Sequence, residues 1–416
     1  MRIAQISTIA GSSADGTSVR VAGLSQGLAL RGHSVSTYCW KQCEELCGDF
    51  EKSNLSMLKY LAVALEPDSP LERLISSDSR MRGHLDEVLN PILRLYFRRM
   101  RGFEILHCHL HRATSVIERI RDPKRQRLLF DYQGTLTLND VNRSGILDMP
   151  SWSPNRKERW EASLLAKANG VSFVTETLRR RMCKIYALDY ARTYVIPDGV
   201  DCDYMARNLD RNIVNDLRKK WHGESRKIVM YVGLLDEQHG ARYLSAAVSG
   251  MLADSSLAKS LSIVVVGRGS STPQFEVLQE ENPDRLFFVD GVSYRFLPSY
   301  LAAADVLLSP HPRNLIMDSV VSSKVLHYLA SERPAVVTRL AGTSQWLHDG
   351  QDAVFCEPED PSTMVEAVKG LVSDDSRSHR IGKAGALLAR TNFDWSIAAR
   401  KAEEVYRIMI DSQQTI

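Results

Sequence analysis

Three segments of the chain have a composition that could bind an anion. Ala10–Ser18, Tyr231–Gly240 and Ile263–Gly269 each place glycines between an apolar strand pattern and a helical pattern. A glycine-bearing loop that opens a helix exposes backbone N–H groups and the positive end of the helix dipole, which suits a phosphate. None of the three matches the P-loop or the dinucleotide fingerprint, and a single loop of this kind is more often an ordinary turn. Three together favour an anionic ligand such as a diphosphate.

A second candidate group is the run of histidines His107, His109 and His111, which lies at the end of a strand pattern. A neutral imidazole can donate or accept one hydrogen bond beside a reacting group. A histidine at a strand end can equally be structural.

Two patterns could indicate a metal ion. Cys39, Cys43 and Cys47 recur at helical spacing, but a structural zinc site needs four ligands, and no further pair at ligand spacing follows nearby. Asp201 and Asp203 form a D-x-D in a turn, where chance is the simpler explanation. Neither pattern predicts a metal site, so we expect no metal ion. A diphosphate also needs none in principle, because fixed cations and helix dipoles can stabilise its charge.

The elements that position these residues alternate between short apolar strands and helical periodicity, which is an α/β pattern. It predicts two Rossmann-like doubly wound domains that face a central cleft. We expect an N-terminal domain over 1–200, a linker over 201–225, a C-terminal domain over 226–390, and a helix over 391–416 that packs back towards the N-terminal domain. The expected strands are 2–7, 34–39, 105–107, 127–131, 171–174 and 194–196, then 228–232, 262–266, 286–289, 306–309, 335–338 and 353–356.

Composition and charge restrict the class of protein. With 44% hydrophobic and 25% charged residues among 416, the chain is globular. It has neither a stretch of ~18–20 apolar residues nor a signal peptide, so we expect a cytoplasmic protein. Residues 1–200 hold 29 Lys and Arg against 22 Asp and Glu, and the remainder holds 24 against 28. A basic first half suits an anionic membrane surface or is simply a solvated face; no nucleic-acid partner is expected.

The stretch Ile92–Arg101 is basic and amphipathic. Its cations and large apolar residues fit an interfacial helix on the cytoplasmic face of an anionic membrane. The alternative is a surface helix whose apolar face packs into the first domain.

Five short motifs follow one another along nearly the full length of the chain. They are Gly16…Leu24…Leu28…Arg31-Gly-His33-Ser-Val35, Val195-Ile-Pro-Asp-Gly-Val-Asp201, Tyr231-Val-Gly233 with His239-Gly240, Leu301-Ala-Ala-Ala-Asp305-Val-Leu-Leu-Ser309-Pro310, and Ser323-Lys324-Val-Leu-His327-Tyr328. In order, they resemble the glycine loop with its GHxV strand, the IPNGVD turn, the YVGRL…KG segment, the ADVFVLPS strand and the KxxEYxAxGxPVV helix of one family. That family is the retaining glycosyltransferases of the GT-B type, group 1 or family four.

The resemblance implies that the second domain binds a nucleotide diphosphate-sugar donor. Lys324 is retained at its family position, and the family's first glutamate falls on Ser319, next to Asp318. Arg242 and Arg268 lie close enough in sequence to the glycine loops to supply charge. The implied donor-binding residues are Gly16, Gly233, His239, Gly240, Arg242, Arg268, Asp318, Ser319, Lys324 and His327.

Other donor positions depart from the family pattern. Leu234 stands where the family usually has Arg, and His239 stands where it has Lys, so one phosphate-binding charge is lost and another becomes dependent on pH. His327 replaces the glutamate that accepts hydrogen bonds from the ribose. A neutral imidazole accepts only one hydrogen bond and cannot reproduce a bidentate carboxylate.

The activity that the resemblance implies is sugar transfer to a hydroxyl of a glycan or lipid-linked acceptor, with retention of configuration. The departing diphosphate would take the acceptor's proton in a front-face attack, so no cofactor and no metal ion are implied. His109 falls at the family's HxH position, near the reacting sugar, and is the implied catalytic residue. The alternatives are a catalytically silent partner or scaffold protein, for which the departures argue, and a nucleotide-sugar epimerase.

Overall fold

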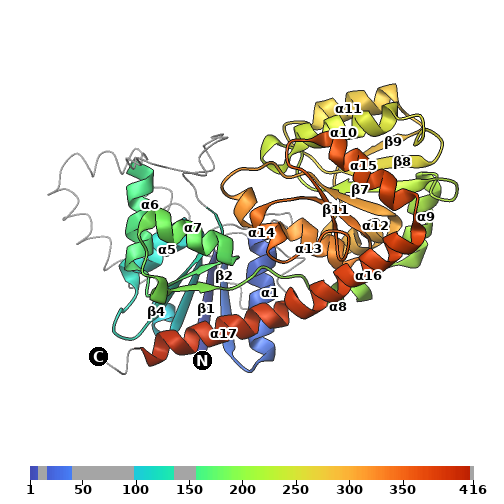
Figure 1. Ribbon diagram of the computed structural model, residues 1–416. Coiled ribbons are helices and arrows are strands. Elements are labelled where there is room, and N and C mark those ends of the chain that lie inside the picture. Colours follow the sequence, from blue (N-terminus) through green and yellow to red (C-terminus); the bar gives the residue numbers. More distant parts are fainter. Residues whose placement is uncertain (8–15, 40–97, 135–155, 413–416) are drawn as a thin grey trace. The chain divides into compact units, whose positions relative to one another are not determined.

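The computed structural model describes residues 1–7, 16–39, 98–134 and 156–412, which are coloured in Figure 1. The chain forms two compact units. The first consists of Met1–Asp198 together with Trp395–Ile416, and the second of Gly199–Asp394. The second unit is therefore inserted, in sequence, between the body of the first unit and its last helix.

The described strands of the first unit form one parallel six-stranded sheet. In sheet order they are β2 (Ser34–Cys39), β1 (Arg2–Ser7), β3 (Ile105–His109), β4 (Arg127–Tyr132), β5 (Gly170–Phe173) and β6 (Thr193–Val195). Every residue of β3 and β4 is buried, which is typical of a parallel sheet covered on both faces. The helical elements are α1 (Gly16–Leu30), η1 (Arg98–Gly102), α5 (Leu110–Ile120), α6 (Arg156–Lys167), α7 (Glu176–Tyr186), η2 (Tyr190–Arg192) and α17 (Trp395–Asp411).

The second unit repeats this architecture with a second parallel six-stranded sheet among its described residues. In sheet order its strands are β12 (Val354–Cys356), β11 (Ala335–Thr338), β10 (Val306–Ser309), β7 (Lys227–Val232), β8 (Leu261–Val266) and β9 (Leu286–Val289). Apolar clusters line both faces of this sheet. The helical elements are α8 (Cys202–Arg207), α9 (Arg211–Lys220), η3 (Glu237–His239), α10 (Ala241–Ala253), α11 (Thr272–Glu281), η4 (Tyr294–Phe296), α12 (Leu297–Ala303), η5 (Met317–Ser319), α13 (Ser323–Ala330), α14 (Ala341–Ser344), α15 (Pro361–Val372) and α16 (Asp375–Asn392).

The segment expected to be a linker, residues 201–225, instead carries α8 and α9 and belongs to the second unit. Met205 and Trp221 are buried in the apolar core of that unit. Arg218 donates to the carbonyl oxygen of Ala303 at 2.8 Å. These helices are short and mostly polar, so only a few core residues distinguish them from a linker in the sequence.

The last helix, α17, packs on α1 within the first unit. Two glycines of α1 permit the close approach. A Cβ at Gly23 would lie 2.2 Å from Cδ2 of Trp395, and one at Gly27 would lie 2.7 Å from Cβ of Ala399. Because glycine has no Cβ, the two helix backbones can approach one another at these positions.

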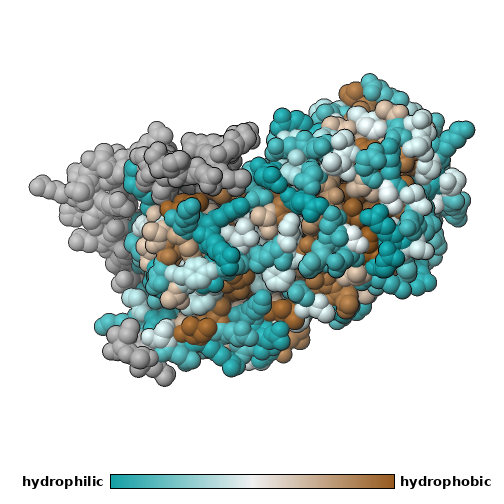
Figure 2. Space-filling model, viewed as in Figure 1, coloured by the Kyte–Doolittle hydropathy of each residue, from teal (hydrophilic) through white to brown (hydrophobic). Residues whose placement is uncertain are grey.

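Hydrophilic residues cover much of the described surface on the face shown in Figure 2, and hydrophobic residues occur there in separate patches. Within the described part of the chain, we find no helix whose length and apolar character would let it cross a membrane.

Replacing Gly23 with alanine should destabilise the first unit by about 1–3 kcal/mol, because the new methyl group overlaps the Trp395 ring. Differential scanning calorimetry should show a lower melting temperature for the first unit and an unchanged transition for the second. Gln26→Ala is the matched control, since Gln26 is exposed on the same helix. Equal melting of the Gly23→Ala and Gln26→Ala variants would contradict the packing described.

Candidate functional site

The glycine loops after β7 and β8 pack against each other through their backbones. A Cβ at Gly267 would lie 1.8 Å from the carbonyl oxygen of Gly233, and one at Gly269 would lie 2.1 Å from that of Leu235. Leu235 N–H donates to the carbonyl oxygen of Arg268 at 2.9 Å. Glycine is required at these positions for the close packing of the two loops.

The turn into α10 is also fixed by a glycine. Gly240 has φ +82°, in the left-handed region, and a Cβ there would lie 1.7 Å from the carbonyl oxygen of Pro310. Just before it, the carboxylate of Asp236 accepts hydrogen bonds from the backbone N–H of His239 at 2.9 Å and from its Nδ1 at 2.7 Å. This turn holds His239 next to the chain segment that follows β10.

Lys324 lies beside this loop on α13. Its Nζ donates to Oη of Tyr231 at 2.9 Å and lies 4.5 Å from the centre of that ring. A Cβ at Gly233 would be only 2.8 Å from Nζ, so the ammonium group lies against the first glycine loop. Burial lowers the pKa of Lys324 to about 7, and Asp236 opposes this shift. Burial and the charge of Lys324 also lower the pKa of His239, against the effect of Asp236.

Lys324, His239, Gly233 and Gly240 are thus brought together at the carboxyl edge of the second sheet. A lysine with so low a pKa is a weakly compensated cation, and an anionic ligand would stabilise its charged form. We call Tyr231, Asp236, His239 and Lys324 the cationic group.

The two arginines expected to supply charge have exposed side chains that pair with carboxylates. Arg242 is 67% exposed and pairs with Glu237 at 3.0 Å. Arg268 is 73% exposed and pairs with Asp290. Each side chain thus has a carboxylate partner on the surface.

The expected ribose-binding residue, His327, is engaged within the unit. Its Nδ1 lies 2.7 Å from the carbonyl oxygen of Ser323, so it must donate there, and its Nε2 can only accept from Oη of Tyr294 at 3.1 Å. The ring is 5% exposed. Both ring nitrogens of His327 therefore have partners within the unit.

Asp318 and Ser319 are buried and hold the backbone around α14. Asp318 accepts a hydrogen bond from the N–H of Ala341 at 3.0 Å, and Oγ of Ser319 donates to the carbonyl oxygen of Leu315 at 2.5 Å. A Cβ at Gly342 would lie 2.5 Å from the carbonyl carbon of Ser319. These contacts give both residues a structural role.

Sequence reasoning did not single out His311, which follows β10. Its Nδ1 lies 2.9 Å from Oγ of Ser309, and its ring centre is 6.1 Å from that of His239. It is 4% exposed, and among the described residues its Nε2 has no hydrogen-bond partner. The sequence feature that could have identified His311 is its position just after the carboxyl end of a predicted strand.

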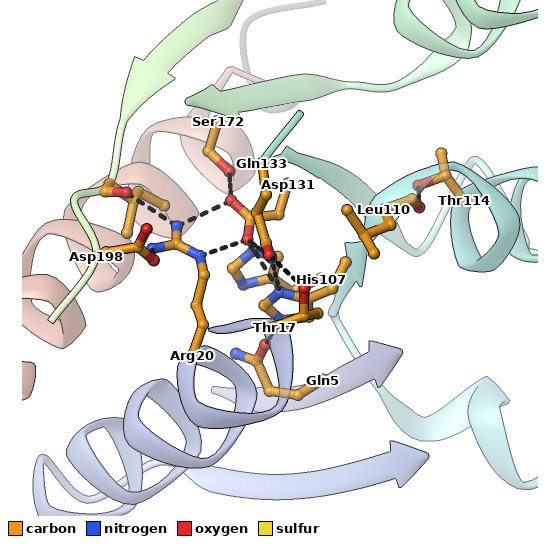
Figure 3. Close-up of polar contacts among 12 residues, drawn as sticks. Gln5, Thr17, Arg20, His107, Leu110, Thr114, Asp131, Gln133, Ser172 and Asp198 are labelled. Atoms are coloured by element: carbon orange, nitrogen blue, oxygen red, sulfur yellow. Dashed lines mark hydrogen bonds and ion pairs between the residues drawn. The ribbon is translucent and has the colours of Figure 1, made fainter. Parts of the chain in front are cut away.

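A buried polar network forms the corresponding edge of the first sheet (Figure 3). Arg20 on α1 forms a bidentate ion pair with Asp131 on β4, at 2.7 and 2.9 Å. Its remaining N–H groups donate to Asp198 and to the carbonyl oxygens of Ile196 and Pro197. Arg20 holds the pKa of Asp131 well below its usual range, although burial opposes this.

His109 is wholly buried in this network. Its Nδ1 lies 2.9 Å from Asp131 and 3.0 Å from Gln133, and its Nε2 lies 2.6 Å from Oε1 of Gln5. Burial lowers the pKa of His109 to about 4. The residue expected to be catalytic thus has a partner at both nitrogens, so among the described residues it orients Gln133 and Asp131.

The other residues of this edge are anchored in the same way. Gly16 begins α1 and is exposed, and Oγ1 of Thr17 donates to Gln133 at 2.9 Å. Residues 10–15, which precede Gly16 in its loop, lie outside the described residues. Glu161 on α6 accepts hydrogen bonds from Tyr132 at 2.6 Å and Tyr186 at 2.9 Å.

Among the residues that the structure describes, His107, His109 and Asp131 could hold a metal ion, since their ligand atoms lie within 4.8 Å of one another. Both oxygens of Asp131, however, already bind the guanidinium of Arg20. A second cation would compete with this buried charge. The donor set therefore suits a hydrogen-bonded network better than a metal centre.

Two family models match the sequence, one in each half of the chain. Residues 14–204 match the model described as Glycosyltransferase Family 4, and residues 226–374 match the model described as Glycosyl transferases group 1. Two parallel α/β units with these matches define a glycosyltransferase of the GT-B fold. The chain belongs to the group 1, family 4 glycosyltransferases.

Individual relatives are distant. The chain is 24% identical over 257 residues to the alpha-D-kanosaminyltransferase of Streptomyces kanamyceticus, a match covering 60% of this chain and 63% of that enzyme. It is 24% identical over 404 residues to the D-inositol 3-phosphate glycosyltransferase of Geodermatophilus obscurus, covering 94% of this chain and 85% of the relative.

Solved structures share the fold. A glycosyltransferase from Rickettsia africae superposes with a TM-score of 0.69 at 14% identity, covering 98% of each chain. Anabaena HepE in complex with UDP superposes with a TM-score of 0.69 at 11% identity, covering 98% of this chain and all of HepE.

Replacing Asp131 with asparagine should destabilise the first unit by about 3–5 kcal/mol, because it leaves the buried Arg20 guanidinium without its main counter-charge. Calorimetry should show the loss at neutral pH. Asp122→Asn, at a half-exposed surface carboxylate, is the matched control.

The pH dependence of this difference follows from the lowered pKa of Asp131. The stabilisation is fully present above the unfolded-state value of about 3.9 and is lost as pH falls through the lower folded-state pKa. The gap between wild type and Asp131→Asn should therefore shrink below about pH 4. A gap that does not change with pH would contradict an ionised Asp131.

Proposed function

We propose that the protein transfers a sugar from a nucleotide diphosphate-sugar to a hydroxyl acceptor with retention of configuration, and that the second unit binds the donor. The proposal rests mainly on the cationic group beside Gly233 and Gly240, in which Lys324 has no ion-pair partner among the described residues. The named relatives are a kanosaminyltransferase and a D-inositol 3-phosphate glycosyltransferase, and the HepE structure holds UDP. These proteins support the proposal of a nucleotide-sugar donor.

In the proposed reaction, the cationic group would stabilise the leaving group, which is the nucleoside diphosphate. As the bond to the sugar breaks, negative charge develops on the diphosphate, and Lys324 and His239 would neutralise it. Because both side chains are already held in place, little reorganisation is needed. The acceptor, a glycan or a lipid-linked hydroxyl, would be the first unit's ligand, and the reaction would use no metal ion or cofactor.

The second candidate is a catalytically silent glycosyltransferase-like partner protein. The observation that favours it is His327, whose ring is fully occupied where the family has a ribose-binding glutamate. Nucleotide binding with sugar transfer supports the enzyme, and nucleotide binding without turnover supports the silent partner. Retention is tested by the anomeric configuration of the product in nuclear magnetic resonance.

Lys324→Ala should weaken binding of UDP or GDP by roughly 10- to 150-fold. This is the loss in affinity expected when one charge-assisted hydrogen bond to a phosphate is removed. Titration calorimetry in EDTA gives the dissociation constants. Lys383→Ala, at an exposed lysine of the same unit, is the matched control. If wild type binds neither UDP nor GDP nor their sugars, the proposed donor site is wrong.

The same lysine predicts a pH dependence. Its pKa is about 7 in the free protein, and a bound diphosphate stabilises the charged form. Affinity should thus be highest below pH 7 and fall by up to about tenfold per pH unit above it. His239 acts in the same direction at lower pH. Lys324→Ala should remove the decline above pH 7, and a wild-type profile flat between pH 6 and 9 would refute this assignment.

We also propose that the protein is cytoplasmic and contacts anionic membranes through the surface around η1. Residues 92–97 of the expected basic helix lie outside the described residues. Met100 is buried, which agrees with inward packing at that position, whereas Arg101 is exposed. Arg101, Arg121 and Arg125 line a cavity of about 320 Å³ between η1 and the turn after α5. Asp122 lines the same opening and pairs with Arg125 at 3.9 Å, and Arg121 donates to the carbonyl oxygen of Lys167. The lining still carries a net positive charge, which suits a phosphate headgroup.

The double substitution Arg101→Glu with Arg125→Glu should reduce binding to phosphatidylserine vesicles at least roughly tenfold, since each cation near the surface contributes about 1 kcal/mol. Co-sedimentation measures the bound fraction. Arg380→Glu with Lys383→Glu, on exposed residues of α16, changes the net charge equally. Equal loss in both double variants would mean that only net charge matters.

A further inference from the structure

His311 combines deep burial with an unused hydrogen-bonding atom. The side chain is 4% exposed, and among the described residues Nε2 has no partner, while Nδ1 is held by Oγ of Ser309 at 2.9 Å. A buried polar atom without a hydrogen bond costs about 1–3 kcal/mol. Such an atom persists when a water molecule or a ligand completes its hydrogen bonding.

The position of His311 relates it to the cationic group. Its ring centre is 6.1 Å from that of His239, and its electrostatic neighbours are His239 and Lys324. The carbonyl oxygen of Pro310 lies against Gly240, at the beginning of α10. The chain therefore brings His311 to the start of the 13-residue helix α10, where the N-cap residue Gly240 has no side chain to cap the first N–H groups.

The hydrogen bond to Ser309 determines which nitrogen of the His311 ring can donate. When Oγ–H of Ser309 donates to Nδ1, the neutral imidazole carries its proton on Nε2. An N–H next to Lys324 and the first turn of a helix suits an anionic oxygen. The cavity that His311 itself lines beside Ser309 is about 10 Å³, enough for about one water molecule and too small for a phosphate. A phosphate would therefore have to meet the ring on the side of the cationic group.

We propose that His311 is a further donor-site residue, whose Nε2 donates a hydrogen bond to a phosphate oxygen of the nucleotide diphosphate beside Lys324 and His239. This rests on the proposed function, since it assumes that the donor binds in the second unit. In this arrangement three nitrogen bases from η3, the segment after β10 and α13 surround the diphosphate. Asp236 is the acidic residue of the group, and it faces His239 rather than His311.

Two substitutions of His311 distinguish the contributions of its two ring nitrogens. His311→Asn keeps a polar group near the position of Nδ1 for Ser309 and removes Nε2, whereas His311→Gln places its amide near Nε2. Asparagine should weaken UDP and GDP binding roughly tenfold or more, and glutamine should weaken it only a few-fold. Uridine and guanosine, which lack phosphate, should bind equally well to all three proteins, so the ratio of diphosphate to nucleoside affinity is the decisive readout.

The control is His348→Asn, at a mostly exposed histidine of the same unit that pairs with Asp352. His311→Asn with wild-type affinity for UDP and GDP would overturn the inference and leave the donor site intact. An equal loss for nucleosides and diphosphates would overturn it too, because that pattern indicates a packing role. Failure of wild type to bind any of these ligands would overturn the proposed function itself.

A second measurement covers the case in which His311→Asn does not fold. In wild-type protein labelled with ¹⁵N-histidine, saturation with UDP should shift the ring signals of two histidines. His239→Asn identifies one of them, and the second is the prediction for His311. A single shifted ring, or shifts that uridine reproduces, would overturn the inference.

Discussion

The ion pair between Arg20 and Asp131 is the interaction on which the first unit depends. Two charges removed from water are stable only when every donor and acceptor has a partner. Arg20 meets this condition by reaching β4 and the turn after β6, and Asp131 meets it through Ser172, Gln133 and His109. The carboxyl ends of β3, β4, β5 and β6 and the first turns of α1 are thereby held in one arrangement.

The second unit handles buried charge in the opposite way. Lys324 is held by a phenol and an aromatic face rather than by a carboxylate, and the nearest acidic residue of its group is occupied by His239. The positive charge of Arg20 is neutralised by a carboxylate within the fold, whereas that of Lys324 would be neutralised by a bound anionic ligand. This asymmetry between two similar sheets supports the proposal that the second unit binds the anionic donor.

The fold could be predicted from the sequence because buried parallel strands are short, apolar and bounded by polar turns. Strands such as Leu286–Val289 and Val306–Ser309 occur where the pattern placed them. The site could be predicted only in part. Glycine loops and Lys324 follow from motif spacing, but His327 is occupied by Tyr294, a residue 33 positions away, and Arg268 by Asp290. Side-chain partners of this kind are decided by tertiary packing, which no local pattern encodes.

The inserted order of the units has a consequence for biosynthesis. The helix α17 belongs to the first unit but is made after the whole of the second unit. During translation the second unit can fold as soon as it emerges, because all its strands are contiguous. The first unit must wait with the groove at Gly23 and Gly27 uncovered, and His107 without Tyr406, until the last residues leave the ribosome. Nascent chains stalled before Trp395 should accordingly be protease-sensitive in their N-terminal part alone.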